Sequence, residues 1–281
     1  KAVSFRHISN LYHTKTLVQS LSPNVSSSRI PRIRDESGSR ILEGHTARVV
    51  QIGPSELDLI HDIFGSKGTH TETTILPQLH SNLSLRILTK LASSRQKIAD
   101  LEPAQLYSTQ FLNETNGPKY GFMKKNISRT YVVESESELV LTLGNIGIAN
   151  IYAKRAVNSS STQAKYETVE VQVSLDGQLP STIFFPASGI HEKIPTIKNF
   201  SPPKKYTNFY RLLIRRRSQP DDTRTLISAI APPDVMHGFS IFGMAFSNYN
   251  QLTLIAGLTF SIVFDFFAKS LAKEDWLFAS I

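Results

Sequence analysis

The chain has 281 residues, a formal net charge of +8 and no cysteine. Its length allows one large or two ordinary domains with a substantial hydrophobic core. The lack of cysteine excludes a disulfide scaffold, a thiolate metal site and a cysteine nucleophile, whereas the basic balance favours a polyanionic partner, either a nucleic acid or an anionic membrane surface.

The first hundred residues combine strand and helix patterns. Residues 47–52 predict a strand. The apolar spacing then predicts helices over residues 55–64 and 83–92, with Ser55 and Asn82 as their N-caps. We therefore expect this part of the chain to have a mixed α/β structure.

The next distinct block runs over residues 106–130, where an apolar strand leads through an Asn-Gly-Pro turn into a basic segment. Tyr120 and Phe122 stand among the basic residues. This interleaving suits contact with phosphates together with packing against bases or sugars, and a basic β-hairpin on the surface accounts for the same pattern. The basic residues are Lys119, Lys124, Lys125 and Arg129.

A second basic run, from residue 193 to 217, contains no aspartate or glutamate. Residues 168–173 and 183–185 predict two strands before it. The arginine fork suits bidentate contact with phosphate or guanine, so we interpret the run as a nucleic-acid surface, with a plain solvated face as the alternative. Its basic residues are Lys193, Lys198, Lys204, Lys205, Arg211, Arg215, Arg216 and Arg217.

The last quarter of the chain is the most informative part. Residues 208–217 and 223–233 are β-branched runs joined by a Pro/Asp turn, which predicts a hairpin. Residues 249–272 predict a helix that is apolar on nearly every face and should lie buried against that hairpin, as a core helix in place of a membrane span. The predicted fold class is α+β, with a mixed N-terminal part over residues 1–100 and a β-rich domain over 101–281 that is closed by the buried C-terminal helix.

No catalytic constellation is found in the sequence. The eight histidines are scattered without a His-x-x-x-His pair, and neither a nucleophile elbow nor a phosphate-binding loop occurs. The segment Ser201-Pro-Pro-Lys204 lacks the aromatic fourth residue that an amino-methyltransferase motif needs for stacking on its target base. We assign no catalytic residue and no metal ligand, and whether this chain is an enzyme by itself stays open.

Three segments resemble large DNA adenine methyltransferases of the type IIG restriction-modification class and their phage-exclusion relatives. Residues 209–233, which include Arg-Thr-Leu-Ile-Ser-Ala-Ile-Ala-Pro-Pro, are similar to two consecutive strands of that family, and His237 after the Pro-Pro also fits. Residues 258–269 resemble the family's Phe-Asp-Phe helix. Residues 107–121 resemble a segment just before its target-recognition part.

The resemblance implies the non-catalytic C-terminal part of such an enzyme, which holds the DNA and selects the target. The family's S-adenosylmethionine loop and Asn-Pro-Pro-Tyr motif do not occur here, so S-adenosylmethionine is expected only for a catalytic domain outside this chain. The family continues from its Phe-Asp-Phe helix into an Asn/Asp-rich turn, whereas this chain continues with Lys-Glu-Asp-Trp-Leu-Phe at residues 273–278.

We therefore predict the DNA-binding target-recognition portion of a site-specific DNA adenine methyltransferase that acts in restriction-modification or phage defence. The expected partners are double-stranded DNA and a methyltransferase catalytic domain or chain, in the cytoplasm and without a membrane. The alternative is a truncated structural or interaction module that binds no specific DNA. Strand neighbours alternate faces, so only some arginines of the strand can touch DNA. The candidate DNA contacts are Lys204, Lys205, Arg211, Arg215, Arg216, Arg217 and Arg224, followed by Lys119, Lys124, Lys125 and Arg129.

Overall fold

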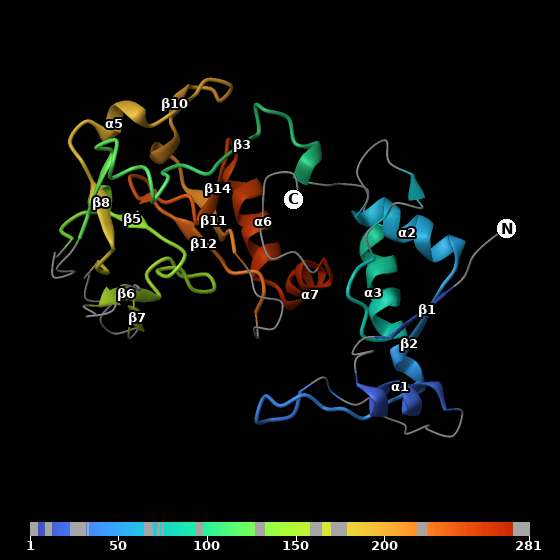
Figure 1. Ribbon diagram of the computed structural model, residues 1–281. Coiled ribbons are helices and arrows are strands. Elements are labelled where there is room, and N and C mark those ends of the chain that lie inside the picture. The colour runs from blue at the N-terminus through green and yellow to red at the C-terminus, as the bar shows by residue number, and fades with distance from the viewer. Residues whose placement is uncertain are drawn as a thin grey trace. The chain divides into compact units, whose positions relative to one another are not determined.

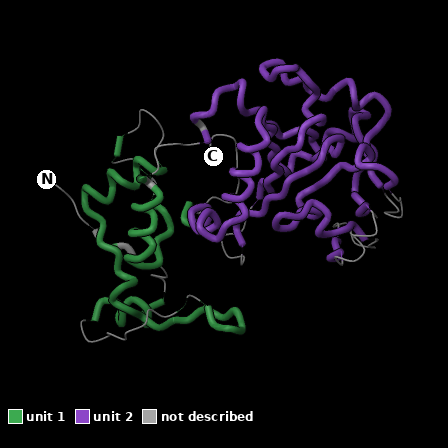
Figure 2. Tube along the Cα trace, turned by 180° about the vertical axis from the view of Figure 1, so that it is seen from behind, with its two compact units in different colours: residues 1–97, 270–272 green, residues 98–269, 273–281 purple. Residues whose placement is uncertain are grey.

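The computed structural model contains two compact units (Figure 2). Unit 1 comprises residues 1–97 and 270–272, and unit 2 comprises residues 98–269 and 273–281. Both units contain helices and strands, so the predicted α+β class is confirmed. The structure describes residues 5–8, 13–22, 32, 34–64, 70–71, 74, 76–93, 98–126, 133–157, 165–169, 179–217 and 224–271.

Unit 1 has a two-stranded antiparallel sheet and three helices in its described residues (Figure 1). Val50 and Ile52 of its second strand and Ile60 and Leu88 of its helices are fully buried. The elements are β1 (Phe5–Ile8), α1 (Thr14–Leu21), the 3-10 helix Thr46–Arg48, β2 (Val49–Ile52), α2 (Pro54–Phe64) and α3 (Asn82–Ala92).

Helix α2 begins one residue earlier than predicted. Pro54 is its first residue, a position that suits the fixed φ and the missing N–H of proline. The carboxylate of Glu56 accepts a hydrogen bond from the N–H of Gly53 at 2.8 Å. Ser55 therefore lies inside the helix, and its assignment as the N-cap was wrong.

Helix α3 is also displaced by one residue from its prediction. It begins at Asn82, and Ser81 is its N-cap, because the Ser81 hydroxyl accepts a hydrogen bond from the N–H of Ser84 at 3.4 Å. The assignment of Asn82 as the cap was therefore wrong, although the helix itself was predicted correctly.

Unit 2 is built around two four-stranded sheets, with strand orders β12-β11-β14-β3 and β13-β5-β8-β4. The first sheet is antiparallel throughout, and the second contains one parallel pair, β13 with β5. Their strands are β3 (Leu106–Thr109), β4 (Met123–Lys125), β5 (Val140–Leu141), β8 (Phe184–Pro186), β11 (Arg211–Arg215), β12 (Ser228–Ala231), β13 (Met236–His237) and β14 (Ile241–Phe246).

Two small hairpins and a short helix complete the β-rich part of unit 2. Strand β6 pairs antiparallel with β7, and β9 with β10. The bounds are β6 (Lys154–Val157), β7 (Lys165–Thr168), α5 (Ile190–Lys193), β9 (Thr196–Ile197) and β10 (Lys204–Lys205), with 3-10 helices at Ile98–Asp100, Glu136–Glu138 and Tyr206–Asn208.

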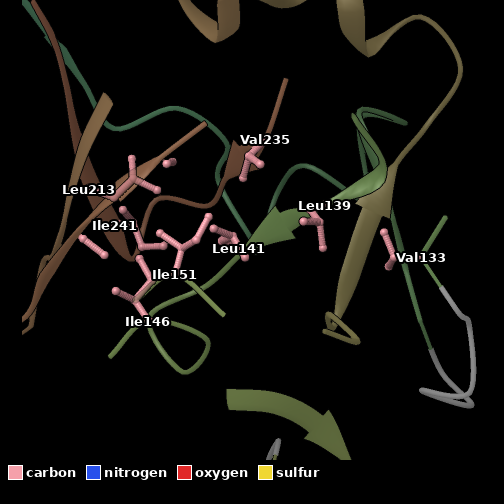
Figure 3. Packing of buried hydrophobic residues seen from close by; sticks show 10 residues of the cluster. Val133, Leu139, Leu141, Ile146, Ile151, Leu213, Val235 and Ile241 are labelled. Atoms are coloured by element: carbon pink, nitrogen blue, oxygen red, sulfur yellow. The ribbon is translucent and has the colours of Figure 1, made fainter. Parts of the chain in front are cut away.

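The predicted C-terminal hairpin is confirmed, because β11 and β12 pair antiparallel with Leu213 opposite Ala229. A strand that the sequence did not indicate, β14, pairs with the other side of β11. Leu213 and Ile241 of this sheet lie beside Leu141 of β5 in one hydrophobic cluster (Figure 3). The main core of unit 2 therefore lies between the two sheets.

The opposite face of the first sheet is covered by α6 (Tyr249–Phe260), as Figure 1 shows. The hydroxyl of Ser228 in β12 donates to the hydroxyl of Thr259 in α6 at 2.9 Å. Leu252, Ile255 and Ala256 are buried on the same side of the helix. The prediction that a C-terminal helix lies against the hairpin is thus confirmed, whereas its burial on nearly every face was wrong, because Leu254 and Leu258 on the other side of α6 are exposed.

The single predicted helix over residues 249–272 is instead a pair, α6 and α7 (Ile262–Ser270), bent by 69°. The break occurs at Ser261, which has extended backbone angles and whose hydroxyl accepts the N–H of Phe264 at 3.1 Å. In the described part of the chain no single helix is long and apolar enough to cross a membrane, and one pair, α6 with α7, meets both criteria only when its two helices are combined.

Two other predicted segments have different outcomes. The surface-hairpin alternative for residues 106–130 was wrong, since β3 belongs to the first sheet and β4 to the second. The predicted strand 168–173 lies largely outside the described residues, because only its first two residues are described and β7 ends at Thr168.

Candidate nucleic-acid interface

The arginines of β11 lie on the face of the strand that is turned toward the second sheet. Leu213 belongs to the hydrophobic cluster between the sheets. Because side chains alternate along a strand, Arg211 and Arg215 share the face of Leu213, while Leu212 and Ile214 share the opposite face. The sequence pattern alone marked these arginines as the leading DNA contacts.

Arg211 is fully buried and its guanidinium binds the main chain. Its Nε donates to the carbonyl of Phe209 at 2.9 Å, and one terminal nitrogen donates to the carbonyls of Pro232 and Val235 at 2.9 and 2.7 Å. The guanidinium also lies 5.0 Å from the ring centroid of Tyr206. Arg211 therefore cannot reach a phosphate, and its prediction as a DNA contact was wrong.

Two further predicted arginines bind main-chain carbonyls inside unit 2. Arg215 donates to the carbonyl of Ile146. Arg224 donates to the carbonyl of Phe260 at 2.9 Å, and its Nε lies 3.6 Å from a carboxylate oxygen of Asp265. These contacts give both guanidinium groups a structural role. The prediction that Arg215 and Arg224 contact DNA phosphates is therefore withdrawn.

The last two arginines of the strand segment lie nearer to solvent. Arg216 is half-buried, with its guanidinium 4.3 Å from the ring centroid of Phe239. Arg217 is exposed. Both stay candidate contacts.

Behind Arg211, a buried hydrogen bond joins Tyr206 to His237 at 2.9 Å. The Nδ1 of His237 lies 3.1 Å from the carbonyl of Gly238, which can only accept, so Nδ1 carries the proton and Nε2 accepts from the tyrosine hydroxyl. Burial raises the pKa of Tyr206 to about 12. Burial and the charge of Arg211 lower the pKa of His237 to about 3, so both groups are neutral at pH 7.

Gly243 of β14 leaves the space that this pair occupies. A Cβ atom at position 243 would lie 2.0 Å from the Tyr206 hydroxyl and 2.7 Å from Nε2 of His237. No larger residue fits there without displacing the hydrogen-bonded pair. The position of His237 after the Pro-Pro, which the sequence singled out by resemblance, is therefore structural.

The predicted lysines, in contrast, are all exposed. They lie on β4 and the turn before it and on β10, and they are joined by exposed lysines of α5 and of the β9–β10 turn, which the sequence does not single out as candidate DNA contacts. In the described residues 115–126 and 193–210 there is no aspartate or glutamate. We call this set the lysine surface: Lys119, Lys124, Lys125, Lys193, Lys198, Lys204 and Lys205.

Helix α5 joins the segments of the lysine surface. Figure 1 shows α5 following β8, and β8 pairs with β4 so that Lys124 lies opposite Phe185. The Nζ of Lys193 in α5 lies 5.7 Å from the ring centroid of Phe122, just before β4. The Nζ of Lys205 in β10 donates to the carbonyl of His191 in α5 at 2.8 Å.

Hydrophobic packing beneath the surface holds these segments together. Ile190 of α5 packs with Met123 and Phe122 in one cluster. Ile197 and Phe200 of the β9–β10 hairpin pack in a second cluster that also contains Tyr206. One acidic side chain that is exposed on α5, Glu192, moderates the positive charge.

Three predictions remain, on Arg129, on metal ligands and on the extent of the basic run. Arg129 lies outside the described residues. Among the described residues, no group of three or more histidine, aspartate or glutamate side chains could hold a metal ion. The signal that could have found Lys193 and Lys198 was the acid-free run itself, which begins at Lys193.

The chain was also compared with protein-family models, with curated proteins and with solved structures, and it matches none of them.

Proposed function

We propose that unit 2 binds DNA through the lysine surface, and that it is the target-recognition portion of a site-specific DNA adenine methyltransferase. The observation that supports DNA binding is the gathering of seven exposed lysines around α5, with aromatic side chains between them. The three segments that carry the family resemblance support the methyltransferase role.

The chemistry of lysine fits the phosphate backbone. Each ammonium group is a compact charge on a long stem, and each phosphate that it neutralises releases a condensed counterion. Such contacts hold DNA without reading its sequence. Base readout would then fall to other side chains, of which Arg217 is the exposed arginine closest in sequence to the lysine surface.

In this proposal the methyl donor S-adenosylmethionine belongs to a catalytic domain or chain that works with unit 2. Such an enzyme would act in the cytoplasm, in restriction-modification or phage defence. The described residues supply the DNA contacts and no step of the methyl transfer.

Fluorescence anisotropy with a random-sequence DNA duplex tests the proposal. The test variant replaces Lys119, Lys193 and Lys205 by glutamine. The control variant replaces Lys15, Arg86 and Lys90, which are exposed in unit 1, and lowers the net charge by the same three units. We expect the slope of log affinity against log salt to become shallower by about 2 to 3 in the test variant and to change little in the control.

Equal slopes for the two variants would contradict the assignment of DNA binding to the lysine surface. Absence of binding by the unmodified chain at low salt would contradict DNA binding altogether.

A second function is favoured by a different observation, the exposed apolar side chains of α6 and of the first turn of α7. Leu254, Leu258, Ile262 and Val263 are 65%, 46%, 78% and 55% exposed. Contiguous exposed apolar side chains mark protein interaction sites, so the alternative is an interaction module that docks a protein partner and binds no specific DNA. Its test is replacement of Leu254 and Ile262 by serine: loss of partner binding in this variant, together with no sequence-specific DNA binding by the unmodified chain, supports this function.

A further inference from the structure

We propose that Tyr120 is a stacking platform for an unpaired base, so that the lysine surface binds single-stranded DNA through base stacking as well as through phosphates. This inference rests on the proposed DNA binding by the lysine surface and goes beyond it by naming the form of DNA that the surface recognises.

Tyr120 is the most exposed aromatic side chain among those described in unit 2, at 68%. Its ring centroid lies 6.0 Å from that of Phe122, with 44° between the ring planes. Phe122 is half-buried and packs against the cluster that contains Ile190. The inner ring thus supports the outer ring, which is left open to a ligand.

The backbone that carries Tyr120 is fixed before any ligand arrives. The side-chain oxygen of Asn113 accepts the N–H groups of Thr115 and Asn116 at 3.0 and 2.8 Å. The N–H of Tyr120 donates to the carbonyl of Asn116 at 3.0 Å. Gly121 then has a φ of +70°, which a glycine adopts without strain and which turns the chain toward β4. A fixed platform loses little conformational entropy on binding.

Positive charge flanks the aromatic pair. Lys119 precedes Tyr120 in the chain and is exposed, and the Nζ of Lys193 lies 5.7 Å from the ring centroid of Phe122. Proteins that bind single strands combine a basic track for the phosphates with aromatic rings on which successive bases stack. The arrangement around Tyr120 has both parts.

The internal base pairs of a duplex cannot use this platform, because the faces of their bases are covered by their neighbours in the stack and only edges, sugars and phosphates are accessible. An unpaired base exposes both faces. Tyr120 should therefore contribute to binding of a single strand, or of a duplex with an extruded base, and very little to binding of an intact duplex.

The experiment compares a 15-nucleotide single strand of thymidines with a duplex of the same length, by anisotropy on the full chain. Tyr120→Ala should weaken single-strand binding about tenfold and duplex binding less than about twofold. Tyr120→Phe, which keeps the ring, should bind both like the unmodified chain. Tyr249→Ala is the matched control, because Tyr249 is similarly exposed at 58% but lies on α6.

The salt dependence separates stacking from charge. Tyr120→Ala removes no charge, so the slope of log affinity against log salt for the single strand should stay unchanged, whereas Lys119→Gln should reduce it by about 0.7.

Unchanged single-strand binding in Tyr120→Ala, with the duplex still bound by the unmodified chain, overturns the stacking proposal and leaves the proposed function intact. Equal losses on both forms also overturn it, because they indicate a contact that does not depend on an unpaired base. If the unmodified chain binds neither form, the proposed function fails together with this inference.

Discussion

Arg211 carries a positive charge into the centre of unit 2. Three main-chain carbonyls and the ring of Tyr206 compensate for its removal from water. The same charge stands near His237 and helps to keep that histidine neutral. A second positive charge beside the buried Arg211 would be unfavourable, so the charge of Arg211 opposes protonation of His237.

This coupling makes the stability of unit 2 dependent on pH. Because the pKa of His237 is about 3 in the folded chain, below its ordinary value of 6.5, the unfolded chain binds the proton first between these values. The contribution of His237 to the free energy of unfolding is therefore fully present above pH 6.5. It declines as the pH falls, by about 2 kcal/mol between pH 7 and pH 5. Urea unfolding followed by circular dichroism at several pH values measures the decline.

The control is His237→Asn, which keeps a hydrogen-bonding side chain and removes the titration. In this variant, the slope of the free energy of unfolding against pH should be smaller by the contribution of about one proton. An unchanged slope would show that other groups cause the pH dependence.

Substitution by alanine at two glycines of unit 2 should change the stability of the unit in opposite directions. In Gly243→Ala the new methyl group would meet the Tyr206 hydroxyl at 2.0 Å, and we expect destabilisation by about 3 kcal/mol or more. In Gly257→Ala no heavy atom lies within 4 Å of the new methyl group, and alanine should stabilise α6 by about 0.5 to 1 kcal/mol. Thermal unfolding of both variants checks the pair, and a shift of equal sign would refute the described packing around Gly243.

At the scale of elements, Asp265 of α7 holds the segment that immediately precedes β12. One carboxylate oxygen accepts the N–H groups of Thr225 and Leu226 at 2.9 and 2.8 Å, and all three residues are buried. Without this acceptor, two buried donors would lack partners.

Asp265→Ala should therefore destabilise unit 2 by about 2 to 6 kcal/mol. Asp265→Asn keeps an acceptor oxygen and should cost clearly less. Guanidinium unfolding of both variants measures the difference, and equal losses would mean that the negative charge, rather than the two hydrogen bonds, stabilises this contact.

Helices α2 and α3 were predicted well because each has one buried face, which gives a clear apolar periodicity. The β11–β12 hairpin, which is buried on both faces, was predicted from its two β-branched runs and the turn residues between them. The break at Ser261 was missed, because a serine within an apolar run is also compatible with an unbroken helix, and only the tertiary fold decides that its hydroxyl caps α7.

Strand β14 was missed for a related reason. All six of its residues are buried, since α6 covers one face of its sheet and the second sheet covers the other, so its sequence shows no alternation. The same two-sided burial explains the error at Arg211. Charged residues are usually exposed, and nothing local in the sequence shows that this strand is central. The lysines could be predicted as exposed because their segments are the edge strand β4, turns, the short helix α5 and the small β9–β10 hairpin.

At the scale of the whole molecule, the chain forms two compact units, and each contains buried residues of its own. A disturbance in the centre of unit 2 should therefore leave the local stability of unit 1 unchanged. In Gly243→Ala we expect faster amide hydrogen exchange in β11 and β14, and exchange in α2 and α3 like that of the unmodified chain. Hydrogen exchange with mass spectrometry resolves the two sets of peptides, and faster exchange in α2 and α3 would show that the units unfold together.

The pairing of β3 with β14 also determines when unit 2 can assemble during synthesis. Leu106 lies opposite Phe246, whereas in unit 1 Phe5 lies opposite Ile52. At about 5 to 20 residues per second, a ribosome takes on the order of ten seconds between the two strands of the first pair, and only a few seconds between those of the second. Residues 1–97 of unit 1 can therefore begin to fold while unit 2 is still being made, whereas residues 270–272 of unit 1 and the strand that completes the first sheet of unit 2 are among the last parts of the described chain to emerge.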